Sequence, residues 1–380
     1  MDPVRPSGAA RGRGQARTAL VLAGGIGLVV AAALALPAIG RPSEAPLAAA
    51  AAPQLTVRQA VGQHMIFAYH GLKPPAALRR RIARGEAAGV ILFARNIRSV
   101  GQVRATMRSL QAIGRPAGLR APLLVMVDQE GGPVRRIPGA PARAASSVRS
   151  SAHARADGRA AARTLRRAGV NIDLAPVADV GRSGSALVGE RRIYGRTAGR
   201  VAALAGAFAG GLRMGGVLAT AKHFPGLGAA SINTDKAAQR IGTSLATLRR
   251  VDEAPFASLI GDGVDAVMLS TAVYPALDAL PAAFSQSWIS DELRTRLRFA
   301  GVTITDDLGT PAVASFGSLA QQATLAVRAG IDLPLFAKSY TAGAQAAEGL
   351  LRAASDGRLD AGSLRAQAQR VLALRARIAG

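Results

Sequence analysis

Residues 123–137 read LLVMVDQEGGPVRRI, and this stretch indicates the fold. The apolar run 123–127 has the length and composition of a buried strand. Two acids, two glycines and two arginines follow it directly. In parallel α/β proteins the ligand site is built where the strands end, so a polar loop this dense is more typical of a binding site than of a solvent-exposed turn.

The same pattern recurs along the chain. Short apolar runs alternate with longer Ala/Leu/Arg segments of helical period. Eight such runs occupy residues 63–69, 89–94, 122–128, 170–180, 217–224, 266–271, 301–307 and 330–336. Helical stretches between them occupy residues 152–168, 198–214, 245–262 and 286–298. Eight alternating units predict an α/β fold with a single (β/α)8 barrel of the TIM type, and 361–378 is expected to be an outer closing helix. A doubly wound sheet is the main alternative. It is disfavoured because no phosphate-binding Gly-rich fingerprint opens an early helix.

The N-terminus differs from the rest. Arginines at positions 5, 11, 13 and 17 precede an uncharged apolar run over 18–40, and 41–54 is rich in Ala and Pro. We therefore predict a signal peptide or membrane anchor over 1–40, a linker over 41–54 and a barrel domain over 55–380. The run is long enough to span a bilayer, so an uncleaved anchor helix competes with a peptide cleaved near 45–52. Either outcome places the barrel outside the cytoplasm, secreted or anchored to the membrane.

Composition excludes several classes of function. The formal charge of +25 comes almost entirely from arginine spread along the chain, without an aromatic-interleaved basic stripe, so we expect no nucleic-acid partner. Some affinity for anionic wall polymers or lipid head groups is the better interpretation. The chain has no cysteine, which excludes disulfides and cysteine-ligated metals. His64, His70 and His153 match no catalytic motif, so we expect no metal and no cofactor. We also expect a monomer.

Several motifs make the sequence resemble glycoside hydrolase family 3, in particular its bacterial β-N-acetylhexosaminidase branch. They are GVILFARNI, LLVMVDQEGG, VNIDLAPVADV, GERRIYG, TAKHFPG, DAVMLSTAVYPALD, GVTITDDL and AGIDLPLF, and they cover nearly all of residues 60–340 in the family's order. The resemblance implies a barrel whose strand ends bind a carbohydrate substrate.

The resemblance also implies roles for single residues. Asp306, the first acid of TDD, would be the nucleophile of a retaining mechanism, because an oxocarbenium-like transition state needs an ionised carboxylate beneath the anomeric carbon. Asp307 would be structural, and a simple helix N-cap is the alternative reading of TDD. The hydroxyl groups of the terminal sugar would be bound by Asp128, Arg136, Arg191, Lys222 and His223. Carboxylate and guanidinium groups suit vicinal hydroxyls, although barrel salt bridges use the same residue types.

One loop departs from the family. After KHFPG the family usually has GHG and then an Asp-Ser-His triplet that supplies the acid/base histidine, whereas this chain has GLG and then Asn233-Thr234-Asp235. Either Asp235 replaces the histidine as acid/base, or the protein binds sugar without efficient turnover. The paired change favours the first, because a neutral Asn233 can donate a hydrogen bond to Asp235 where an aspartate would repel it.

The sequence therefore predicts an extracytoplasmic, retaining glycoside hydrolase that removes terminal β-linked N-acetylhexosamine, with N-acetylglucosamine from cell-wall fragments as the expected substrate. A catalytically weak wall-glycan binding protein on the same barrel is one alternative. A β-glucosidase of the same family is the other, disfavoured because that group commonly carries its acid/base on a second domain.

Overall fold

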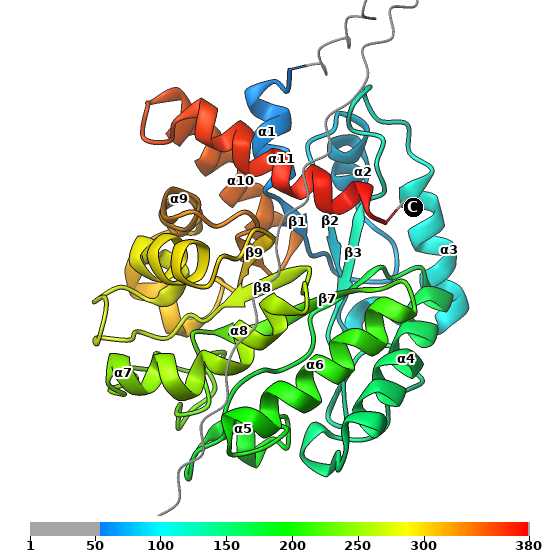
Figure 1. Ribbon diagram of the computed structural model, residues 1–380. Helices are drawn as coiled ribbons and strands as arrows, with labels where there is room; N and C mark the ends of the chain where they lie inside the picture. Colours follow the sequence, from blue (N-terminus) through cyan, green and yellow to red (C-terminus); the bar gives the residue numbers. More distant parts are fainter. Residues whose placement is uncertain (1–53, 379–380) are drawn as a thin grey trace, which may run out of the picture. The chain divides into compact units, whose positions relative to one another are not determined.

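The computed structural model describes residues 54–378, and its centre is a nearly closed ring of eight parallel strands (Figure 1). The order around the ring is β10-β1-β2-β3-β6-β7-β8-β9. The strands are β1 (Ile66–Phe67), β2 (Gly89–Ile91), β3 (Leu124–Val127), β6 (Ile172–Asp173), β7 (Leu218–Phe224), β8 (Ala266–Leu269), β9 (Val302–Thr305) and β10 (Leu335–Phe336). The chain closes where Ile304 bridges Leu333 in parallel. Each of the eight predicted apolar runs contains one of these strands, so the barrel is confirmed.

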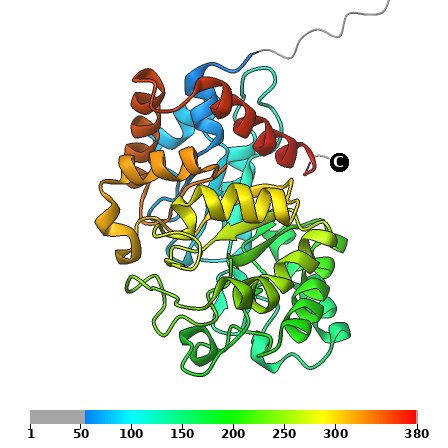
Figure 2. The same cartoon turned by 60° about the vertical axis from the view of Figure 1, so that its left-hand side comes forward.

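Helices surround the ring (Figure 2). They are α1 (Val57–Gln63), α2 (Ala76–Ala83), α3 (Val100–Gln111), α4 (Ser151–Ala168), α5 (Ala186–Gly189), α6 (Ala198–Met214), α7 (Leu245–Thr247), α8 (Ala254–Gly261), α9 (Leu319–Ala329), α10 (Tyr340–Ser355) and α11 (Ala361–Ala376). Two predicted helices are less regular than expected. The stretch 245–262 divides into α7, a π-helical turn η3 (Leu248–Asp252) and α8, and Ser287–Arg296 forms the π-helix η5. Pro255 in the first turn of α8 explains the new start, because proline is tolerated there but not in a helix interior.

Alternation along the strands divides the apolar side chains into two layers. Ile91, Leu124 and Met126 point into the barrel, whereas Val90 and Val125 join the layer between the strands and the helices. This period of two is what a strand imposes on its side chains. Both faces of the ring are therefore buried, which is why the strands read as continuous apolar runs.

The two ends of the barrel are closed differently. At the end where the strands begin, α11 lies across the opening, and its Val371 and Leu374 belong to the interior apolar cluster. At the end where the strands finish, the chain forms polar loops, including the β4 (Gln129–Gly131) and β5 (Val134–Arg135) hairpin after β3. The predicted 361–378 helix is thus confirmed as a closing element.

The predicted signal or anchor segment over 1–40 lies outside the described residues, as does the linker except for Gln54. Within residues 54–378, no helix is both long and apolar enough to cross a membrane.

Candidate active site

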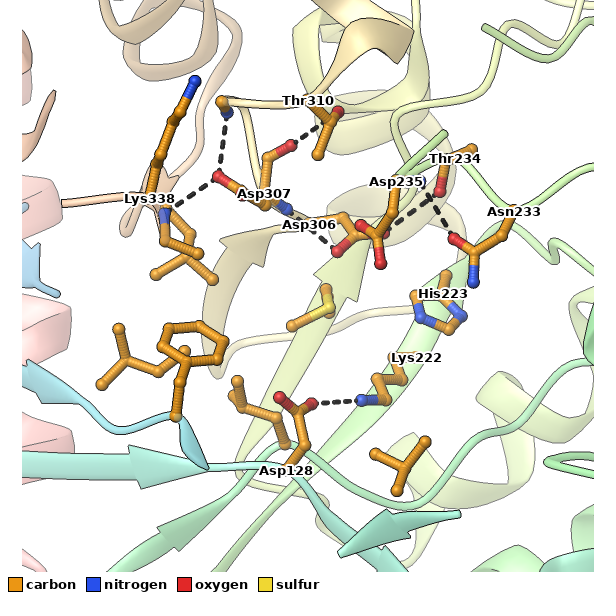
Figure 3. A pocket seen from close by; sticks show the side chains of 18 of the residues that line it. Asp128, Lys222, His223, Asn233, Thr234, Asp235, Asp306, Asp307, Thr310 and Lys338 are labelled. Atoms are coloured by element: carbon orange, nitrogen blue, oxygen red, sulfur yellow. Dashed lines mark hydrogen bonds and ion pairs between the residues drawn. The ribbon is translucent and has the colours of Figure 1, made fainter. Parts of the chain in front are cut away.

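A cavity of about 480 Å³ opens at the carboxyl ends of the strands. Its polar wall comes from elements far apart in the sequence. Asp128 follows β3, Lys222 and His223 end β7, and Asp306 follows β9 (Figure 3). Because parallel strands end at the same rim, these side chains share one cavity.

A chain of buried ion pairs forms one side of the cavity. Lys222 Nζ lies 2.7 Å from Asp128 Oδ1 and 2.7 Å from Glu130 Oε1. Arg192 also donates two hydrogen bonds to Glu130, of 2.9 and 2.8 Å. Burial acts to raise the pKa of Glu130, but Arg192 and Lys222 outweigh it and hold that pKa well below its usual range. Burial acts to lower the pKa of Lys222, but the carboxylates of Asp128 and Glu130 outweigh it and raise this pKa to about 12. The groups are therefore charged and mutually oriented at neutral pH.

His223 is held from behind by a carboxylate. Its Nδ1 lies 2.7 Å from Oδ2 of Asp179, a fully buried residue that also accepts the backbone N–H groups of His223 (3.2 Å) and Leu227 (2.7 Å). With three donors arranged around it, Asp179 acts as the acceptor and assigns the ring proton to Nδ1. Nε2 is then the ring nitrogen available for a ligand or a proton.

Asp306 and Asp307 have different surroundings. Asp306 Oδ1 accepts the N–H of Asp307 at 2.9 Å, and its Oδ2 lies 3.4 Å from Thr234 Oγ1. Asp307 Oδ1 instead accepts the N–H groups of Gly309 (2.8 Å) and Ala337 (2.9 Å). Burial, with smaller contributions from Asp306 and Asp235, raises the pKa of Asp307 to about 6. Asp307 thus fixes the loops after β9 and β10, as a structural residue would.

The loop after β7 brings Asp235 to the cavity on the side of Asp306 (Figure 3). Asp235 is solvent-accessible, yet partial burial and then the Asp306 carboxylate raise its pKa. The expected hydrogen bond from Asn233 to the Asp235 carboxylate is wrong. Asn233 Oδ1 accepts the backbone N–H of Asp235 at 2.9 Å, while its Nδ2 donates to both oxygens of Glu190 at 3.0 and 3.1 Å. The short Asx turn directs the amide away from the neighbouring carboxylate.

The two predicted arginines lie in different places. Arg136 lines the cavity, and its buried Nε has no partner among residues 54–378. Arg191 does not line the cavity. It has a positive φ of 60°, and its guanidinium donates to Ser147 Oγ at 3.2 Å. The left-handed backbone at Arg191 turns the chain, and its neighbour Arg192 reaches the cavity instead.

Seven of the residues predicted from the sequence line the cavity: Asp128, Arg136, Lys222, His223, Asn233, Asp235 and Asp306. Sequence reasoning missed four polar residues that hold them: Glu130, Asp179, Glu190 and Arg192. Each of these four residues lies inside one of the family motifs quoted above. The sequence of two adjacent arginines, or of an acid at a strand end, does not show which side chain points into the cavity. Within the described part of the chain, no group of three or more His, Cys, Asp or Glu side chains is arranged to hold a metal ion.

Comparisons with known proteins agree with this geometry. Residues 53–374 match the family model described as the glycosyl hydrolase family 3 N-terminal domain. A secreted glycosyl hydrolase of Arthroderma benhamiae is 39% identical over 347 residues, which cover 88% of this chain and 98% of that protein. A beta-hexosaminidase of Alkalilimnicola ehrlichii is 36% identical over 282 residues, covering 71% of this chain and 79% of that protein.

Solved structures give the same result. The family 3 beta-N-acetylglucosaminidase of Paenibacillus sp. superposes with a TM-score of 0.80 at 33% identity, over 86% of this chain and 63% of that structure. The beta-N-acetylhexosaminidase of Beutenbergia cavernae superposes with a TM-score of 0.77 at 33% identity, over 84% of this chain and 98% of that one. The protein is therefore a member of glycosyl hydrolase family 3, and its barrel corresponds to the N-terminal domain of that family.

Proposed function

We propose that this protein is a retaining glycoside hydrolase that removes terminal β-linked N-acetylhexosamine, with N-acetylglucosamine as the sugar. The observation that carries the proposal is the placing of Asp306 and Asp235 on one side of a cavity that the paired Asp128 and Lys222 also line. The names of the beta-hexosaminidase and beta-N-acetylglucosaminidase relatives support the choice of sugar.

The reaction proceeds in two displacements. An ionised Asp306 oxygen attacks the anomeric carbon, the bond from that carbon to the glycosidic oxygen breaks, and Asp235 gives its proton to the departing oxygen. Water then attacks the same carbon and loses a proton to Asp235, while the bond to Asp306 breaks. The hydrogen bond from the Asp307 N–H orients Asp306 for this role. Asp128, Arg136, Lys222 and His223 bind the sugar hydroxyls, and Arg192 takes the part first assigned to Arg191.

Asp235 has the properties that the proton donor needs. Partial burial and the nearby Asp306 carboxylate both favour its protonated form. His223 is the competing donor, because the buried Asp179 carboxylate orients its ring in the way a catalytic dyad would. The solvent-accessible loop position of Asp235 favours it, since a proton donor to a leaving group must reach the outer side of the bound sugar.

We further propose that the protein acts outside the cytoplasm on cell-wall fragments, secreted or held at the membrane by residues 18–40. The basic N-terminus followed by an apolar run supports export. The relative from Arthroderma benhamiae is described as secreted, which agrees.

The test is hydrolysis of aryl β-N-acetylglucosaminides by the wild type and by Asp306→Asn, Asp235→Asn and His223→Asn variants. A slow fluorinated glycoside should label Asp306 covalently. Asp235→Asn should lower kcat/KM for a nitrophenyl leaving group by about 10²- to 10⁴-fold and by much less for a dinitrophenyl group, which leaves without a proton. Activity of the wild type should fall as the pH rises through the pKa of Asp235.

Other outcomes would point elsewhere. If His223→Asn alone shows this leaving-group dependence, the histidine is the acid. If Asp306 cannot be labelled and no aryl glycoside is cleaved by folded protein, the wall-glycan binding alternative is correct. Cleavage of aryl glucosides only would favour the β-glucosidase alternative.

A further inference from the structure

The end of the barrel opposite the active site is strongly basic. Helices run back from the strand ends to this side, so the last turns of α4 and α6 meet here with α1, α11 and the loop before β3. We call this surface the basal face and define it by Arg58, Arg120, Arg166, Arg167, Arg213 and Arg377. All but the half-buried Arg213 are exposed.

A hollow of about 400 Å³ lies within the basal face, lined by Arg166, Arg213, Arg377 and Asp265. Asp265 is buried, pairs with Arg377 and accepts the Ala219 N–H at 2.9 Å. Arg166 donates to the Gly215 carbonyl and Arg213 to the Gly263 carbonyl, and neither lies within 4 Å of a carboxylate in residues 54–378, although the charge of Arg213 acts on Asp265. The hollow therefore holds three guanidinium groups and one carboxylate, an excess of positive charge of a size that suits a phosphate group.

Two of the exposed carboxylates near this end are engaged, while a third, Asp262, is exposed beside Arg213, which donates to its backbone carbonyl. Asp356 pairs with Arg358 at 3.0 Å, and Asp360 caps the N-terminus of α11 through the Ser363 N–H at 2.7 Å. The active-site end is different, because there the acids and bases pair with one another across the cavity. The basal face therefore carries more positive than negative charge, whereas most of the buried charges at the site are paired.

The chain also enters the barrel at this face. The first described residue, Gln54, leads directly into α1, which carries Arg58. Only residues 41–53 separate Gln54 from the apolar run that ends at Gly40. Thirteen residues reach at most about 45 Å when extended, so a bilayer that held the apolar run would be tethered no farther than that from the start of the barrel.

We infer that the basal face docks on an anionic phospholipid surface, with lipid phosphate in the hollow between Arg166, Arg213 and Arg377. Arginine forks match phosphate oxygens, and each basic residue near such a surface adds to the attraction. In this orientation the sugar cavity points away from the bilayer, toward its substrate. The inference concerns binding and does not depend on the proposed activity.

The test uses residues 51–380, which form one compact unit whose core runs from Leu55 to Leu374. This unit lacks the apolar run, so any vesicle binding belongs to the barrel. Cosedimentation is measured with vesicles of phosphatidylcholine alone and with an equal mixture of phosphatidylcholine and phosphatidylglycerol. A basal variant replaces Arg58, Arg166 and Arg167 with Gln. A matched control replaces Arg104, Arg155 and Arg159, which are exposed on α3 and α4 ahead of the last turns of these helices.

The wild type should bind only the mixed vesicles, and added salt should weaken the binding. The basal variant should lose affinity by about tenfold or more, while the control should bind like the wild type. Equal thermal unfolding midpoints would show that all three proteins are folded. Three results would overturn the inference: equal losses of binding in both variants, no binding by the wild type, or displacement from the vesicles by a short DNA duplex. Each would show that the basal face is not a specific binding surface for phospholipid.

Discussion

At the scale of single residues, Asn233 connects the loop that carries Asp235 to the neighbouring loop that follows β6. Its amide group donates to Glu190, which also pairs with Arg192 at 3.1 Å. An aspartate at 233 would place a second carboxylate against Glu190. We predict that Asn233→Asp lowers kcat/KM by about tenfold to a hundredfold, the loss of a charged hydrogen bond of ~1.5–3 kcal/mol.

A paired variant separates positioning from damage to the fold. Combining Asn233→Asp with Glu190→Gln restores the hydrogen bond, because the side chain at 190 now donates it and the side chain at 233 accepts it. Most of the activity should therefore return. The loss in Asn233→Asp should also be smaller for a dinitrophenyl than for a nitrophenyl glycoside, because the loop positions the proton donor. A double variant no better than Asn233→Asp would show that the contact with Glu190 does not position Asp235.

Lys222 has a second residue-scale role, which is to neutralise two buried carboxylates. Replacing it with Met leaves Asp128 and Glu130 without that charge, and we expect a loss of about 3–5 kcal/mol in the free energy of unfolding at pH 7. The lowered pKa of Glu130 gives stability that is present above its unfolded pKa and is lost as the pH falls. Urea unfolding should therefore show a smaller stability difference between the wild type and Lys222→Met at pH 4 than at pH 7.

The control for this prediction is Lys338→Met, at an exposed lysine on the same cavity, which should change stability by less than about 0.5 kcal/mol. A similar loss of stability in both variants would contradict the neutralising role of Lys222.

At the scale of elements, the strands could be predicted from the sequence, while the loops that complete the site could be predicted only in part. Every strand of the eight-stranded barrel is buried on both faces, so its apolar run is easily recognised in the sequence. The choice between Arg191 and Arg192 depends on one left-handed backbone position, and the direction of the Asn233 amide depends on Glu190, 43 residues away. Contacts of that kind leave no periodic signal in a sequence.

The closing helix α11 gives an element-scale prediction. Its fully buried Arg375 donates to the carbonyl groups of Leu119, Ala121 and Pro122 and to the Gln63 side chain. Burial lowers the pKa of this arginine to about 10, so it remains charged at neutral pH. Arg375→Met would leave these acceptors buried without a donor and should cost at least about 2 kcal/mol in urea unfolding. Arg352→Met, at an exposed position of α10, should cost less than about 0.5 kcal/mol. Equal stability of the two variants would mean that α11 is held by apolar packing alone.

At the scale of the whole molecule, the carboxyl groups of the buried Glu253 and the half-buried Asp307 contribute to how stability changes with pH. Burial, only partly opposed by Arg296, raises the pKa of Glu253 to about 7, and burial raises that of Asp307 to about 6. A raised folded pKa gives stability that is complete below the unfolded pKa, near 4, and is lost as the pH rises through the folded value. The chain has only 4 histidines, so its large net charge changes little over this range. We predict that the free energy of unfolding falls between about pH 4 and pH 8, by about 3 kcal/mol for each group over the whole range at 1.36 kcal/mol per pKa unit. Asp307→Asn and Glu253→Gln, which stay uncharged, should together give a clearly smaller fall than the wild type in urea titrations. A wild-type profile that rises over this range would show that the ionised forms are the ones the fold stabilises.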